Sequence, residues 1–126
     1  MTYDPKVKLL TLIKLISFVK FESREFESRY FAGSPIVGEI LSELEVQFNS
    51  GKEIAFEVDL DSPFGKTLIN SIKWHLKETE EWENMEVQDK LLHIVNLASP
   101  YKLEEETIQI IMVNRDMYCD DFTNED

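Results

Sequence analysis

The side chains best suited to acid–base or nucleophilic chemistry are two histidines, His75 and His93, and one cysteine, Cys119. Each histidine lies within an amphipathic stretch, which favours a structural imidazole over a catalytic one. Cys119 has no partner for an intrachain disulfide and lies in a polar segment without a supporting motif. We therefore expect no catalytic residue, and a small enzyme using His75 or His93 stands as the alternative.

Metal and cofactor motifs are absent from the sequence. No HExxH or paired-cysteine pattern occurs. Residues 59–61 begin like a calcium-binding loop, but Pro63 and Phe64 stand where a ligand and the turning glycine belong. The four glycines are not grouped into a phosphate-binding loop. We expect neither a metal site nor a cofactor.

Negative charge is concentrated in the C-terminal part of the chain. The net charge is −12, of which −1 falls on residues 1–77 and −11 on residues 78–126. Such a field repels nucleic acid and anionic lipid and attracts basic proteins. The small basic cluster Lys6, Lys8, Lys14 and Lys20 shares its helix with the core, which further disfavours nucleic-acid binding.

Two groups of acidic residues, each beside an aromatic residue, form the predicted partner-binding surface. Carboxylates at a helix C-terminus oppose the helix dipole, a cost that a positively charged partner would relieve. A large aromatic ringed by carboxylates also suits an interface hot spot. The predicted contacts are Glu78, Glu80, Glu81, Trp82, Glu83, Glu86 and Asp89 in the first group, and Asp116, Tyr118, Asp120 and Asp121 in the second.

Each of the four prolines follows a residue that commonly caps helices. The pairs are Asp4-Pro5, Ser34-Pro35, Ser62-Pro63 and Ser99-Pro100. Proline suits the first helical position, and the preceding Asp or Ser can accept a hydrogen bond from a free backbone N–H. With the apolar periodicity, these pairs predict helices over 5–20, 35–48, 63–82, 86–97 and 100–118, with a further helix or a bent continuation over 21–31.

The expected fold is mainly α, a compact bundle of five or six helices. The apolar stripe of helix 35–48 comprises Ile36, Ile40, Leu41, Leu44 and Phe48. Alternation over 54–60 indicates a short β element that needs a partner elsewhere. We expect one domain over 1–118 and a flexible acidic tail over 119–126. No membrane-spanning or secretory segment is recognised, so a cytoplasmic protein is expected; the oligomeric state stays open.

Small size, the absence of catalytic motifs, and the acidic half around Trp82 and Glu104–Glu106 resemble bacterial immunity proteins of the contact-dependent growth inhibition type. The resemblance is one of overall profile and rests on no shared motif. It implies a cytoplasmic protein that binds and blocks a cognate basic toxin, such as an RNase that cuts tRNA. The alternative in another class is a phage-type acidic nucleic-acid mimic or anti-restriction protein.

Overall fold

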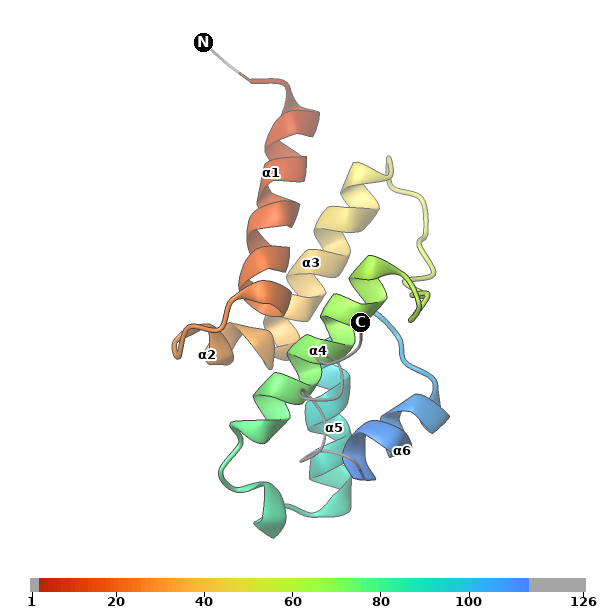
Figure 1. The fold of residues 1–126 in the computed structure, drawn as a ribbon. Coiled ribbons are helices and arrows are strands. Elements are labelled where there is room, and N and C mark those ends of the chain that lie inside the picture. The colour runs from red at the N-terminus through yellow and green to blue at the C-terminus, as the bar shows by residue number, and fades with distance from the viewer. Residues whose placement is uncertain (1–2, 114–126) are drawn as a thin grey trace.

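The computed structural model describes residues 3–113, and it confirms a mainly α fold (Figure 1). None of the helices in this range is long and apolar enough to cross a membrane. The elements in order are α1 (Pro5–Ser17), the π-helical turn η1 (Phe18–Glu22), α2 (Ser28–Ala32), α3 (Pro35–Phe48), α4 (Pro63–Lys77), the 3₁₀ turn η2 (Trp82–Asn84), α5 (Val87–Ala98) and α6 (Glu105–Val113). The predicted tail, 119–126, lies outside the described residues.

Three of the four Asp/Ser-Pro pairs begin a helix, as predicted. The side chains of Asp4, Ser34 and Ser62 each accept a hydrogen bond from a backbone N–H two or three residues later. The prediction is wrong at Ser99-Pro100, because α5 ends at Ala98 and α6 begins only at Glu105. There the pair stops one helix instead of starting the next, since proline cannot continue the α5 hydrogen-bond ladder.

The helices form two packed groups (Figure 1). In the first, α1 and α3 lie side by side and run in opposite directions; in the second, α5 packs against both α4 and α6. The segment η1–α2 connects the groups, because η1 contacts α1, α2 and α4. The β element predicted over 54–60 reduces to an isolated parallel bridge between Glu57 and Lys102, with Lys102 N–H donating to Phe56 O at 3.0 Å.

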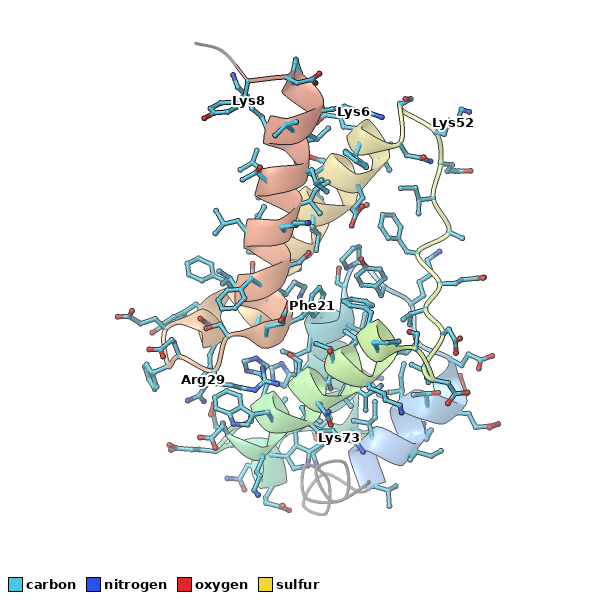
Figure 2. The ribbon with its side chains drawn as sticks, turned by 45° about the horizontal axis from the view of Figure 1, so that its top comes forward. Lys6, Lys8, Phe21, Arg29, Lys52 and Lys73 are labelled. Atoms are coloured by element: carbon cyan, nitrogen blue, oxygen red, sulfur yellow. The ribbon has the colours of Figure 1, made fainter. Side chains whose placement is uncertain are left out.

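The core lies where these groups meet. Phe21 is 1% exposed, and its ring packs edge-on against Phe64 at a centroid distance of 5.7 Å. Figure 2 shows Phe21 at the junction of the N-terminal helices with α4. On α3, Leu41 is buried as predicted, whereas Ile36 and Ile40 are exposed. The predicted apolar stripe of this helix is therefore wider than the face that the core covers.

A buried lysine joins the two groups. Lys20 is 0% exposed, although the sequence places it with the basic residues of the first helix. Its Nζ donates to Ala32 O at 2.6 Å, Asn96 O at 2.8 Å and Leu97 O at 3.3 Å. These carbonyls lie at the C-terminal ends of α2 and α5, where helices leave acceptors without intrahelical partners. Lys20 therefore ties the N-terminal half of the fold to α5.

Candidate functional site

The first group of predicted contacts lies at one end of the α4–α5 pair. Glu78 caps the C-terminus of α4, the connection 79–86 includes η2, and Asp89 lies in the first turn of α5. In Figure 1 this connection forms the lower end of the molecule. We call its exposed carboxylates the acidic end; its members are Glu78, Glu80, Glu81, Glu83, Glu86 and Asp89.

Trp82 is not available as a surface anchor, and that prediction is wrong. The indole is 4% exposed and belongs to the hydrophobic core. Exposing so large an apolar side chain to water costs free energy, and the short 3₁₀ turn avoids this cost by directing the indole into the core. Lys90 Nζ lies 5.0 Å from the Trp82 ring centroid, over one face of the indole. Of the first group of predicted contacts, the carboxylates are exposed and Trp82 is not.

Trp82 instead holds the acidic end in place from inside. Met85, three residues later, also packs against the core. The N–H of Met85 donates to Trp82 O, and the N–H of Trp82 donates to Thr79 O. Arg29 on α2 adds a hydrogen bond of 2.8 Å from Nη2 to Glu78 O. The connection between α4 and α5 is thus fixed by the buried Trp82, the partly buried Met85, and hydrogen bonds to its backbone.

The second group of predicted contacts lies outside the described residues. It comprises Asp116, Tyr118, Asp120 and Asp121, together with the single cysteine, Cys119. The sequence does not decide whether the two groups share one surface, and the second group lies beyond the residues that the structure describes.

Next to the acidic end, tertiary packing brings the two histidines into one pocket. The pocket has a volume of about 200 Å³ and is lined by Arg29, His75, Thr79, Glu81, His93 and Leu97. The sequence does not predict that the two histidines lie together, and it predicts no role for Arg29 or Thr79. The spacing of His75 and Thr79, one helical turn, was the available local signal; no local signal relates Arg29 to them.

The hydrogen bonds in this pocket do not prepare a nucleophile. The Thr79 hydroxyl donates its one proton to His75 O at 2.8 Å. It therefore accepts from His93 Nε2, 3.3 Å away, which places the imidazole proton on Nε2. Burial lowers the pKa of His93, and the nearby carboxylate of Glu81 opposes that shift. A hydroxyl activated by a base needs the opposite direction of donation.

His75 is a neutral, buried imidazole at pH 7. Its side chain is 3% exposed, and its Nε2 makes no hydrogen bond within the described residues. Burial lowers its pKa from 6.5 to about 4, and the positive charge of Arg24 adds to that effect. Residues 3–113 hold no group of three or more His, Cys, Asp or Glu side chains arranged to bind a metal ion.

The depressed pKa of His75 predicts acid sensitivity of the fold. In the unfolded chain His75 takes up its proton near pH 6.5, but in the folded chain only near pH 4. Between these values the unfolded state binds more protons, so stability falls as the pH falls. We expect this group to contribute a loss of about 2 kcal/mol between pH 7 and pH 5.

Urea unfolding of the wild type and of His75→Gln at several pH values measures that loss. Glutamine does not titrate, so the variant should lose less stability than the wild type over this interval. Parallel pH profiles for the two proteins would show that His75 titrates normally in the folded state.

No family model, curated protein or solved structure matches this chain.

Proposed function

We propose that this protein is an immunity protein that binds a cognate basic toxin domain and occludes its active site. The toxin would be a nuclease acting on RNA such as tRNA, and the immunity protein would act in the cytoplasm without catalysing a reaction itself. One observation carries the proposal: six exposed carboxylates gather on the α4–α5 connection and the helix ends that flank it, and the core holds this connection in place.

The charge of the acidic end suits a nuclease as partner. Within residues 77–90 six carboxylates outnumber two lysines, Lys77 and Lys90. A nuclease must bind substrate phosphates, so its active site carries positive charge. Carboxylates that approach such a site accelerate association and, where they become desolvated, slow dissociation.

The fixed backbone of the acidic end adds to affinity. A surface that is already ordered in the free protein loses little conformational entropy on binding. With Trp82 and Met85 packed against the core, the carboxylates of Glu80, Glu81 and Glu83 stand on a connection that does not have to fold on binding. The absence of a prepared nucleophile in the imidazole pocket also supports binding over catalysis among the described residues.

Charge reversal tests the proposal. The triple variant Glu80→Lys, Glu81→Lys, Glu83→Lys should bind the toxin domain encoded in the same locus at least tenfold more weakly than the wild type. Isothermal titration calorimetry measures the affinity, and inhibition of tRNA cleavage by the toxin domain measures occlusion. Cells expressing the toxin domain should lose protection in parallel.

A matched control separates the acidic end from overall charge. The triple variant Glu104→Lys, Glu105→Lys, Glu106→Lys changes the net charge by the same amount, at exposed positions around the start of α6. It should retain most of the affinity and all of the protection. If both triple variants weakened binding equally, the effect would be due to net charge alone. If the Glu80/Glu81/Glu83 variant bound as tightly as the wild type, the acidic end would not be part of the interface.

A further inference from the structure

A second surface, distant in sequence from the acidic end, is apolar. The helices α1, α2 and α3 carry large apolar side chains that are between 42% and 66% exposed. Three of them, Leu15, Phe31 and Ile40, line a groove of about 280 Å³ together with Ile16, Val19 and Val37, and all six lining residues are apolar. We call this surface the apolar face; its main residues are Leu12, Leu15, Val19, Phe31, Ile36 and Ile40.

Helical spacing explains why these side chains form a continuous surface. Leu12 and Leu15 on α1 and Val19 in the following turn η1 succeed one another at steps of three and four residues. On α3, Ile36 and Ile40 are four residues apart. A different stripe of α1, centred on the buried Ile13, faces the core. Each helix thus carries apolar side chains on a second side, and a contiguous exposed apolar patch is typical of an interaction site.

The charges on these two helices have opposite signs. Residues 5–17 of α1 contain three lysines and no acidic residue, whereas residues 35–48 of α3 contain three glutamates and no basic residue. Continuing each apolar stripe by one step leads to Lys8 on α1 and Glu43 on α3, both exposed. The helices α1 and α3 run antiparallel (Figure 1), so the start of α1, which carries Lys8, lies beside the C-terminal half of α3, which carries Glu43.

We propose that the apolar face binds a second copy of this chain, forming a symmetric dimer with a four-helix interface. A two-fold interface brings the same patch of both copies together, so the patch must complement itself. With the two-fold axis parallel to the helices, α1 of each copy lies on α3 of the other copy. The basic helix then meets the acidic helix twice, and each Lys8 lies near the second copy's Glu43.

The charge pattern selects this arrangement over others. A two-fold axis perpendicular to the helices would place α1 on α1 and α3 on α3, with like charges facing each other. A partner of a single charge sign would complement only one of the two helices. The two proposed surfaces share no residue, because the apolar face involves α1, η1, α2 and α3 whereas the acidic end belongs to α4, η2 and α5.

The first test is the mass of the full chain in solution. Sedimentation equilibrium of the purified wild type should give twice the monomer mass of 14.8 kDa at micromolar concentration. The double variant Leu15→Glu, Ile40→Glu should be monomeric with an unchanged circular dichroism spectrum, since both side chains are exposed in the monomer. Leu92→Glu, an equally exposed leucine on α5, is the matched control and should leave the dimer intact.

The second test addresses the pairing of the helices. Lys8→Glu and Glu43→Lys should each weaken dimerisation at least tenfold, and the double variant with both changes should restore it. A dimer that the single variants do not weaken, or that the double variant does not restore, would overturn the proposed axis.

A wild type that is monomeric throughout the micromolar range would overturn the proposal outright. If removal of residues 114–126 then produced a dimer, the tail would be the occupant of the apolar face. If neither a second copy nor the tail covered the groove, and the groove became inaccessible to solvent only when the toxin domain was bound, the toxin would be the occupant. Because no toxin is needed for the dimer tests, their failure leaves the proposed function untouched.

Discussion

Replacing Lys20 by methionine should lower the free energy of unfolding by about 4 kcal/mol, the largest effect expected from a single substitution in this protein. The ammonium is 0% exposed and donates to three backbone carbonyls, those of Ala32, Asn96 and Leu97. Methionine keeps most of the apolar stem but has no donor. Two buried acceptors and one part-buried acceptor would then lose this donor, and each buried acceptor left without a partner costs about 1–3 kcal/mol.

The stability of Lys20→Met also tests whether the buried charge of Lys20 stabilises or destabilises the fold. Burial lowers the pKa of its ammonium from 10.5 to about 7, which shows that the site penalises the charge. In the protonated form, three N–H donors face three acceptors at two helix C-termini, where the helix dipoles place negative charge, and these interactions oppose the penalty. If the desolvation penalty of the ammonium exceeded the stabilisation from its three hydrogen bonds, a neutral side chain of similar volume would stabilise the fold.

Urea unfolding at pH 7 measures the difference, with Lys14→Met as the control. Lys14 lies on α1 near Lys20 in sequence, but its side chain is exposed, so its loss should change stability by less than about 0.5 kcal/mol. A Lys20→Met variant as stable as the wild type would show that the three carbonyls gain nothing from the ammonium.

Local capping chemistry was predictable from the sequence, but the role of one proline was not. At Asp4, Ser34 and Ser62 the residue before proline supplies the capping acceptor within three residues, so the sequence contains the whole interaction. The pair Ser99-Pro100 carries the same local signal. Its position directly after α5 decides its role, and the end of a helix is less well marked in sequence than its start.

The acidic end was predictable for a similar reason. Its carboxylates lie within twelve consecutive residues, Glu78 to Asp89, so any compact fold keeps them together. The imidazole pocket was not predictable, because His75, His93 and Arg29 come from three helices whose packing no local pattern reveals. The same limit explains Trp82 and Lys20, since burial depends on what the rest of the chain places around a residue.

The apolar periodicity of α3 predicted a helix correctly but could not tell which apolar residues the chain itself covers. Leu41 is buried, while Ile36, five residues earlier, is 66% exposed. A wide apolar stripe has the same appearance whether it faces one core or a core and an interface. The apolar residues of α3 that the core does not cover can therefore indicate an interface only after the fold is known.

Replacing Gly65 by alanine should lower the free energy of unfolding by about 3 kcal/mol, at the upper end of the usual cost of overpacking. A Cβ at this position would lie 2.6 Å from Leu60 Cα and 2.9 Å from Leu60 C, and closer still to Asp59 O. Because these are backbone atoms, no side-chain rotation can relieve the clash. The turn before α4 cannot retreat easily either, since Ser62 N–H donates to Asp59 O at 3.0 Å.

The expected loss of stability is opposite in sign to the usual effect of replacing glycine by alanine in a helix. Within a helix, alanine stabilises relative to glycine by roughly 0.5–1 kcal/mol, so a loss at Gly65 measures the close approach of the turn 59–62 to α4. Gly33→Ala is the matched control, because a Cβ there would lie 3.5 Å from His93 Cε1 at a negative φ of −97°. Urea midpoints should therefore fall for Gly65→Ala and stay within about 0.5 kcal/mol of wild type for Gly33→Ala. Equal midpoints for the two variants would mean that the turn yields, and that the start of α4 does not depend on its packing against this turn.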